Sequence, residues 1–211
     1  MTNKKRRFNR YLEKNLSKLL KSGYSGLILG PRQVGKTTLV RYLLENRENT
    51  HNYFLQNPKT RADLEKDPER IIREVEAMKK EPIIFVDEAQ KVPELFDAAQ
   101  FLIDEKKAQF VLTGSSARKL RRSGANLLPG RIKRYYLDPL LWGELGLIKE
   151  SNVKNIAMDN INKAGLASLD DLLVFGSLPG IVTLPKSEQE DFLKSYALIY
   201  LDEEIRAESL S

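Results

Sequence analysis

Apolar side chains alternate along the chain between strand-like runs and helix-like spacing. Five short apolar runs predict β-strands, at residues 27–29, 52–55, 83–86, 109–112 and 134–137. The run at 83–86 contains no polar residue, which is typical of a parallel strand buried on both faces. Helical spacing precedes or separates these runs at residues 8–22, from Thr38 onward, at 68–80 and at 93–104. Strands that alternate with helices predict an α/β fold with a parallel sheet and right-handed crossovers.

The pattern changes after Asp138 and Pro139, where no further strand is predicted. Helical spacing returns three times, and turns separate the segments. We expect helices at 140–148, 168–175 and 188–206, with turns at 152–155 and 176–180. Three helices after the last strand predict a small helical subdomain.

The first candidate site lies between a predicted strand and a predicted helix. Residues 30–37 read Gly-Pro-Arg-Gln-Val-Gly-Lys-Thr and fit the phosphate-binding pattern G-x-x-x-x-G-K-[ST]. Glycines let successive backbone N–H groups point at phosphates, at the positive end of a helix. An ordinary glycine-rich turn is the alternative, and the flanking strand and helix argue against it. The predicted nucleotide-binding residues of this loop are Gly30, Pro31, Arg32, Gln33, Val34, Gly35, Lys36, Thr37 and Thr38.

Two side chains of this loop carry the chemistry. Lys36 is expected to reach the β- and γ-phosphates of a nucleotide, and the hydroxyl of Thr37 is expected to ligate Mg²⁺. Asp87 and Glu88 follow the buried run 83–86, at the edge where open α/β sheets bind ligands. Asp87 could hold Mg²⁺ through water, together with Thr37. Glu88 could act as the general base that activates the attacking water. The alternative for the acidic pair is the favourable N-terminal charge of a following helix.

Two further candidate site residues lie between the fourth and the fifth predicted strands. Ser115 could orient a water between Glu88 and the γ-phosphate, with Ser116 as a less favoured choice; helix capping is the structural alternative. Arg131, beside Gly130, could reach the γ-phosphate of a neighbouring subunit and stabilise charge in the transition state. A basic, solvated loop explains Arg131 equally well.

Composition narrows the chemistry only a little. The chain has no cysteine, which excludes disulfides and thiolate metal sites, and its one histidine, His51, is too few for a metal site built from histidines. No run is long enough to span a membrane and no signal peptide is evident, so we expect a cytoplasmic protein without membrane association. The net charge is +6, with five Lys/Arg in residues 1–10 and nine, without acids, in 106–137. Both segments could contact DNA, although solvated faces are the commoner outcome.

As a set, these motifs resemble the AAA+ superfamily of P-loop ATPases. More narrowly, they resemble prokaryotic ATPases that join an AAA+ module to a C-terminal domain of unknown role. The resemblance lies in residues 30–38, 85–90, 112–116, 130–131, 137–140 with Glu144, and 176–180. It implies a five-stranded parallel sheet in the order 5-1-4-3-2, flanked by helices, with a small C-terminal helical lid.

The same resemblance assigns roles to residues outside the loop. It implies that Asp87 and Glu88 are the Walker B pair, that Ser115 is at the sensor-1 position and that Arg131 is an arginine finger. It places Pro179 near the adenine. The base-pocket residues that it implies are Arg10 and Tyr11. A regular sensor-2 arginine is not identifiable, because Arg206 is late in the chain.

These observations predict three parts and one leading function. The parts are a basic amphipathic helix at 1–22, a P-loop ATPase core at 23–150 and a helical lid at 151–211, which we expect to be truncated before a further domain. The predicted function is Mg²⁺-dependent binding and hydrolysis of ATP to ADP, coupled to the lid and to a partner or missing domain. The alternative is a slow nucleotide switch that recruits protein or DNA. Self-association into an oligomer is a further expectation.

Overall fold

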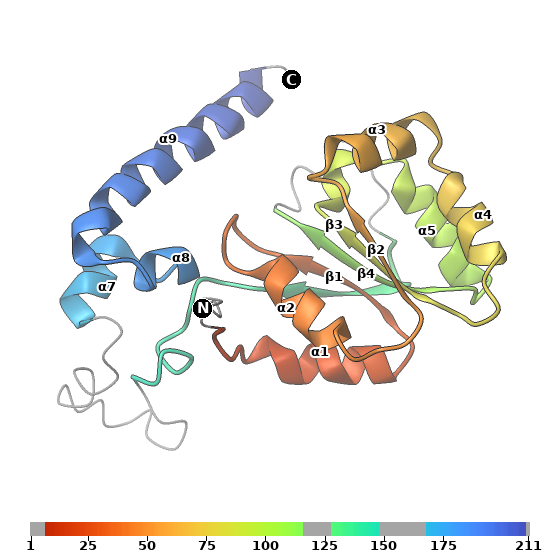
Figure 1. The fold of residues 1–211 in the computed structure, drawn as a ribbon, viewed down its shortest axis with the longest axis horizontal. Helices are drawn as coiled ribbons and strands as arrows, with labels where there is room; N and C mark the ends of the chain where they lie inside the picture. Colours follow the sequence, from red (N-terminus) through yellow and green to blue (C-terminus); the bar gives the residue numbers. More distant parts are fainter. Residues whose placement is uncertain (1–6, 116–127, 148–167, 210–211) are drawn as a thin grey trace, which may run out of the picture. The chain divides into compact units, whose positions relative to one another are not determined.

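The computed structural model describes residues 7–115, 128–147 and 168–209, with side chains in the last helix described as far as residue 200. The chain forms two compact units (Figure 1). One comprises Arg10–Asp138, and the other comprises Met1–Asn9 together with Pro139–Ser211. Each unit is described below by itself.

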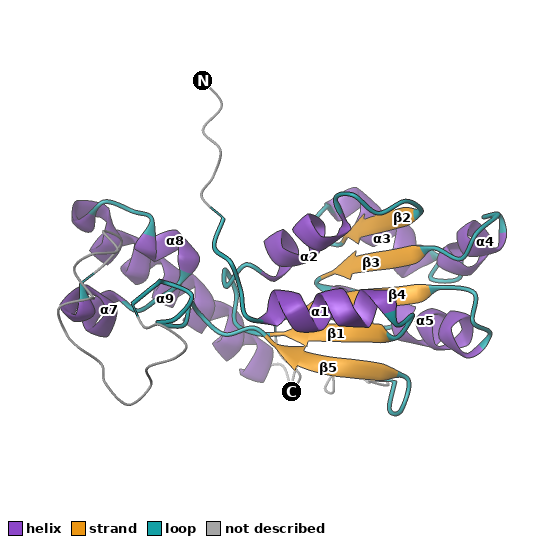
Figure 2. Cartoon of the chain, turned by 90° about the horizontal axis from the view of Figure 1, so that it is seen from below, coloured by secondary structure: helices purple, strands orange, loops and turns teal. Residues whose placement is uncertain are grey.

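A five-stranded, all-parallel sheet forms the centre of the larger unit (Figure 2). The strands lie in the order β2-β3-β4-β1-β5, which is the predicted order read from the other edge. The predicted α/β fold and sheet order are therefore confirmed. The strands are β1 (Ser25–Leu29), β2 (Thr50–Phe54), β3 (Ile83–Asp87), β4 (Gln109–Gly114) and β5 (Ile132–Tyr136).

Helices cover both faces of this sheet. On one face, apolar side chains of two helices meet Val111 of β4; these helices are α1 (Leu12–Lys21) and α2 (Lys36–Leu44). The other face holds the larger core, in which Phe110 and Leu112 pack against the remaining helices. Those helices are α3 (Pro58–Lys66), α4 (Arg70–Glu76) and α5 (Leu95–Asp104), and a single 3₁₀ turn, Ala89–Lys91, follows β3.

Helix α3 was not predicted from the sequence, which placed a strand at 52–55 and the next helix only at 68–80. The side chain of Asn57 accepts hydrogen bonds from the backbone N–H groups of Lys59 and Thr60, so it caps the helix. Pro58 occupies the first turn, where its missing N–H has no intrahelical partner to lose. The helix predicted at 68–80 is shorter than expected and covers Arg70–Glu76.

The smaller unit contains α7 (Leu169–Phe175), α8 (Pro179–Val182) and α9 (Lys186–Ser209). The predictions for 168–175 and 188–206 are confirmed, whereas the helix predicted at 140–148 is wrong. A single turn forms there instead, because Gly146 adopts a φ of +75°. The N–H of Leu147 bonds to the carbonyl of Trp142 and that of Gly146 to the carbonyl of Gly143, which closes the turn.

A small apolar cluster stabilises the smaller unit. Its buried members are Leu140, Leu145, Leu147, Leu172 and Val182. Of the turn predicted at 176–180, residues 176–178 connect α7 to α8, whereas residues 179 and 180 belong to α8; the turn predicted at 152–155 lies outside the described residues. Within the part of the chain that the structure describes, no helix is both long and apolar enough to cross a lipid bilayer.

Candidate functional site

The predicted phosphate-binding loop connects β1 to α2 at the carboxyl edge of the sheet. Gly30 has a φ of +151°, and a Cβ there would lie 2.1 Å from the carbonyl oxygen of Leu137. The segment after β5 therefore runs directly against the start of the loop, and the N–H of Leu137 donates to the carbonyl of Leu29 at 2.8 Å. Gly35 adopts a φ of +96° at the start of α2. Both glycines occupy conformations that other residues rarely adopt.

Lys36 is buried inside this loop. Its Nζ donates to the carbonyl oxygens of Gly30 and Pro31, each at 2.8 Å. Burial lowers the pKa of Lys36, and the nearby carboxylates of Glu88 and Asp87 oppose that effect. The ammonium is thus held across the loop by main-chain oxygens, in a position from which it can bind an anion at the end of β1.

Asp87 and Thr37 meet although 50 residues separate them. The hydroxyl of Thr37 donates to Oδ1 of Asp87 at 2.7 Å. A hydroxyl next to a carboxylate is a pair of hard oxygen ligands of the kind that Mg²⁺ prefers. Among the described residues, no group of three or more His, Cys, Asp or Glu side chains could hold a metal ion by itself. The pair therefore fits Mg²⁺ that receives its other ligands from water and nucleotide phosphates.

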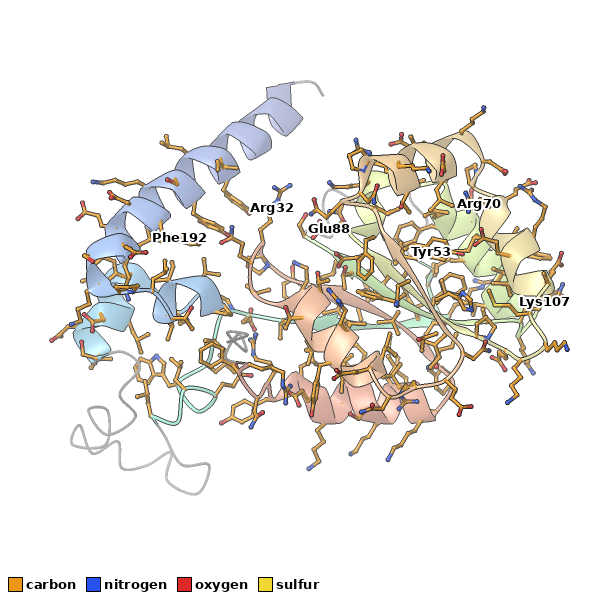
Figure 3. All side chains as sticks on the ribbon, in the orientation of Figure 1. Arg32, Tyr53, Arg70, Glu88, Lys107 and Phe192 are labelled. Atoms are coloured by element: carbon orange, nitrogen blue, oxygen red, sulfur yellow. The ribbon has the colours of Figure 1, made fainter. Side chains whose placement is uncertain are left out.

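Glu88 lies next to this pair with an unusual backbone conformation. Its φ of +59° places it in the left-handed region, and its side chain is buried. The amide Nε2 of Gln90 donates to the carboxylate of Glu88 and to Oγ of Ser115, the latter at 3.2 Å. Gln90 therefore connects the predicted general base to the predicted sensor serine. Figure 3 shows Glu88 and Arg32 at the same end of the larger unit, where β1 and β3 finish.

Arg10 contacts the loop from the segment before α1. It is only 8% exposed, and its guanidinium donates to the carbonyl of Val34 at 2.7 Å and to that of Asp138 at 2.6 Å. Tyr11, its predicted partner in base binding, is 46% exposed. The structure therefore brings Arg10 to the main chain of the phosphate loop, and the role in base binding stays a prediction for both residues.

Within the larger unit, the predicted finger residue Arg131 is not brought to this loop. Arg131 precedes β5, and Ile132 pairs with Ser25 at the start of β1, so Arg131 lies at the opposite edge of the sheet, about 16 Å along the strand. Its guanidinium pairs with Asp104 at 2.5 Å. Pro179 belongs to the smaller unit, where it begins α8. Ser116 lies outside the described residues.

Sequence reasoning missed Thr113 and Gln90 as parts of this site. Thr113 is fully buried near the end of β4; its hydroxyl donates to Oδ1 of Asp87 at 2.7 Å and accepts from the N–H of Glu88 at 3.0 Å. The available signal was a hydroxyl inside an otherwise apolar strand, since a buried hydroxyl needs a hydrogen-bond partner. Gln90 ends the segment 85–90 that carries the family resemblance, but no role was assigned to it.

Comparisons with known proteins find sequence relatives of part of this chain. Two uncharacterised proteins, from Mycobacterium bovis and Mycobacterium tuberculosis, are each 30% identical over 122 residues, which is 57% of this chain and 26% of theirs. The matched segment thus spans about a quarter of these relatives' length.

Solved structures share the fold. A Walker-type ATPase of Pyrococcus abyssi superposes with a TM-score of 0.62 at 16% identity, covering 98% of this chain and 78% of that chain. The ORC1 protein of Aeropyrum pernix, solved in complex with DNA, gives 0.54 at 13% identity, covering 83% of this chain and 56% of that one. At such identities the likeness shows the fold alone.

A family model described as an AAA domain matches residues 24–146. This range runs from just before β1 to the turn at Gly146 and contains the loop, Asp87, Glu88 and Thr113. The match covers more than half of the chain and accords with the sheet order and the P-loop. The chain therefore belongs to the AAA domain family of P-loop ATPases.

Proposed function

We propose that this protein binds and hydrolyses ATP with Mg²⁺, producing ADP and phosphate. The observation that carries the proposal is the 2.7 Å hydrogen bond between Thr37 and Asp87, placed directly beside the buried Lys36. A loop that only bound an anion would not need a carboxylate next to the hydroxyl. Binding of a nucleotide with Mg²⁺ needs both, because the metal-holding groups must lie next to the phosphate-binding ones, and Glu88 beside Asp87 offers the general base that hydrolysis adds.

Each residue then has a defined task. The N–H groups of the loop and the ammonium of Lys36 bind and orient the phosphates. Thr37 and Asp87 would hold Mg²⁺, directly or through water, and the ion when bound neutralises negative charge on the phosphate oxygens. Glu88 accepts a proton from the attacking water, and Ser115 orients that water or the γ-phosphate.

We further propose that nucleotide state is transmitted to the smaller unit. Pro139 follows directly on the segment at 137–138, which contacts the loop through Gly30 and Arg10. A shift of the loop on phosphate binding would therefore reach the connection between the units. In this proposal the region at 151–211 acts as a lid, Pro179 lies near the adenine, and a partner or further domain in the cytoplasm receives the signal.

Hydrolysis by three proteins tests the central claim. We expect ATP turnover by the wild type, loss of nucleotide binding in Lys36→Ala, and tight binding without turnover in Glu88→Gln. Lys59→Ala is the matched control, since Lys59 is an exposed lysine on α3. Equal phosphate release by all four proteins would contradict the proposal.

A second candidate is a slow switch with little intrinsic turnover. The contact of Gln90 with both Glu88 and Ser115 favours it, because groups engaged with each other are not free to act on water. The two candidates differ in rate. Turnover of several per second by the isolated protein would exclude the slow switch, and a rate that rises only with a partner would support it.

Self-association of the protein would bring Arg131 to the γ-phosphate bound by a neighbouring copy. Because Arg131 lies at the edge opposite its own loop, it can act as a finger only on a neighbouring copy. The solution mass of ATP-bound Glu88→Gln tests this. A dimer or ring is expected, and a monomer would leave Arg131 without a catalytic role.

A further inference from the structure

Positive charge is concentrated in the segment of the chain that contains α1 and α2. Residues 10–44 contain seven Lys/Arg and one acid, Glu13. Residues 58–105, which contain α3, α4, β3 and α5, hold thirteen acids and eight Lys/Arg. The segment with α1 is therefore basic and the segment with α3 to α5 is acidic, although the whole chain has a net charge of only +6.

Four exposed lysines lie on α1 and β5. Lys14, Lys18 and Lys21 lie on α1 at intervals of four and three residues, so they form one outward stripe, while the apolar stripe of the helix faces the core. Lys133 lies on β5, paired with Gly26, on which Leu19 of α1 packs. We call Lys14, Lys18, Lys21 and Lys133 the lysine face.

The same side of the sheet carries both parts of the lysine face. Paired residues of parallel strands point to the same side of a sheet, so Lys133 and α1 share a side. Figure 2 shows α1 lying along the sheet at β1, with β5 next to β1 at the edge. The Nζ of Lys133 lies 4.3 Å from the centre of the Tyr24 ring, and Tyr24 itself is 56% exposed.

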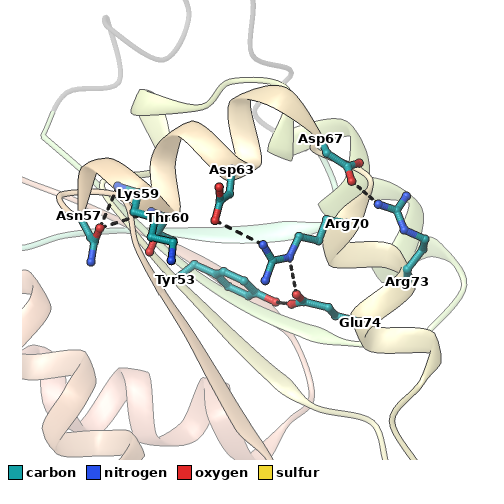
Figure 4. Close-up of polar contacts among 9 residues, drawn as sticks. All are labelled: Tyr53, Asn57, Lys59, Thr60, Asp63, Asp67, Arg70, Arg73 and Glu74. Carbon is teal, nitrogen blue, oxygen red and sulfur yellow. Dashed lines mark hydrogen bonds and ion pairs between the residues drawn. The ribbon is translucent and has the colours of Figure 1, made fainter.

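Among the described residues, the lysine face has no acidic side chain paired with it, unlike the arginines of α3 and α4. In the described part of the chain, none of its four lysines forms an ion pair. On α3 and α4, by contrast, Arg70 pairs with Asp63 and Glu74, and Arg73 pairs with Asp67 (Figure 4). Like charges at i and i+4 destabilise a helix, so the arrangement on α1 is not explained by helix stability. Clustered, unneutralised cations attract a polyanion.

We propose that the lysine face binds the phosphate backbone of double-stranded DNA without reading its sequence. Lysines act as point charges toward phosphates, and α1 holds three of them in a fixed row. A membrane surface fits less well, because Leu16, Leu19 and Leu20 are buried and α1 has no apolar stripe left to insert. Base stacking on a single strand also fits less well, because Lys133 occupies one face of the Tyr24 ring.

This site is separate from the nucleotide loop and does not depend on the proposed ATPase activity. None of the four lysines contacts Lys36, Thr37, Asp87 or Glu88 among the described interactions. Loss of DNA binding and loss of hydrolysis are therefore distinguishable in separate variants.

The test compares two fourfold variants that remove the same charge from different places. One replaces the lysine face with alanine: Lys14→Ala, Lys18→Ala, Lys21→Ala and Lys133→Ala. The other changes four exposed lysines elsewhere: Lys59→Ala, Lys66→Ala, Lys79→Ala and Lys80→Ala. The affinity for a fluorescent duplex of about 20 base pairs is measured by anisotropy over a range of salt concentrations, where each phosphate contact contributes a slope of about 0.9.

The lysine-face variant is expected to bind the duplex about 100-fold more weakly at about 0.1 M salt, and its salt slope should fall by about 3 to 4. The second variant should stay within about threefold of the wild type, and sequence changes in the duplex should have no effect. Equal losses in both variants would show that only net charge matters and would overturn the proposal. A flat salt response of the wild type, or preference for anionic vesicles or single-stranded DNA over the duplex, would also overturn it. Unfolding curves that match the wild type establish that both variants are folded.

Discussion

The hydroxyl of Thr113 donates a 2.7 Å hydrogen bond to Oδ1 of Asp87, from the neighbouring strand of the sheet. The same hydroxyl oxygen accepts the N–H of Glu88 at 3.0 Å. One fully buried side chain therefore fixes both acidic residues of the candidate site. Asp87 receives a second hydrogen bond from Thr37, so its carboxylate is oriented from two elements.

Replacing this hydroxyl by a methyl group should damage stability and metal binding together. Thr113→Val keeps the shape of the side chain but leaves the N–H of Glu88 without a partner. We expect a loss of about 1–3 kcal/mol in the free energy of unfolding, measured by urea denaturation. Mg²⁺-dependent nucleotide binding should weaken by about 10- to 100-fold, because Asp87 loses an orienting contact. Thr113→Ser retains the hydroxyl and is the control; if it behaves like Thr113→Val, the hydroxyl is not the cause.

The sequence was sufficient where local chemistry determines local structure. The apolar run before Asp87 predicted a buried strand, and the loop at 30–37 predicted the strand and helix around it. The sheet order came from the family resemblance. Contacts between distant segments were not predictable, since nothing local to Thr113 indicates that its partner is 26 residues away. The helix at Pro58–Lys66 was missed for another reason, because a proline after a strand suits a turn and a first helical turn equally well.

Gln90 offers a test of how the general base is positioned. Its Nε2 bonds both Glu88 and Ser115, and its Oε1 is buried without a partner among the described residues. Gln90→Leu removes the amide while keeping much of its volume. We expect ATP turnover to fall by about 10- to 100-fold through misplacement of Glu88, with nucleotide affinity within about twofold of the wild type.

Measuring both turnover and nucleotide affinity of Gln90→Leu shows whether the amide of Gln90 positions Glu88 for catalysis or holds it away from the attacking water. Faster hydrolysis by Gln90→Leu would show that the amide holds Glu88 back, as the slow-switch alternative requires. An equal loss of affinity and turnover would indicate general damage to the site. Gln56→Leu is a suitable control, because Gln56 is an exposed glutamine before α3 that bonds only Lys91 among the described side chains.

Variants of Arg10 can distinguish a structural role of this residue from a role in ligand binding. Its guanidinium bonds the carbonyls of Val34 and Asp138, so Arg10→Met should leave both oxygens without this donor. We expect the free energy of unfolding to fall by about 2–4 kcal/mol, since each bond involves a charged donor. Arg10→Lys should recover only part of this loss, because an ammonium lacks the planar fork of a guanidinium.

Calorimetric measurement of ATP affinity decides between the two roles of Arg10. If Arg10 lines the base pocket, Arg10→Met should lose ATP affinity while keeping the stability of the wild type. If Arg10 instead holds the loop against the segment at 137–138, the main effect of Arg10→Met should be a lower free energy of unfolding. Lys18→Met is the control, since Lys18 is an exposed cation of α1 without an ion pair in the described part of the chain.

The start of α7 in the smaller unit should depend on pH in a defined direction. Lys186 bonds the carboxylate of Asp171 at 2.9 Å, and the N–H of Ser168 donates to it at 3.0 Å in a reciprocal capping box. These contacts lower the pKa of Asp171 to about 2, from 3.8. Because the pKa in the folded state is lower than in the unfolded state, the stabilisation is present above about pH 4 and disappears as the pH falls toward about 2.

Asp171→Asn should therefore lower the free energy of unfolding by about 1 kcal/mol at pH 6, and by progressively less between pH 4 and pH 3. Urea denaturation at each pH measures the difference, with Asp170→Asn as the control, because Asp170 has the same charge in the same helical turn but forms neither contact. A difference between Asp171→Asn and the wild type that stays constant from pH 6 to pH 3 would show that the charge of Asp171 does not stabilise the cap.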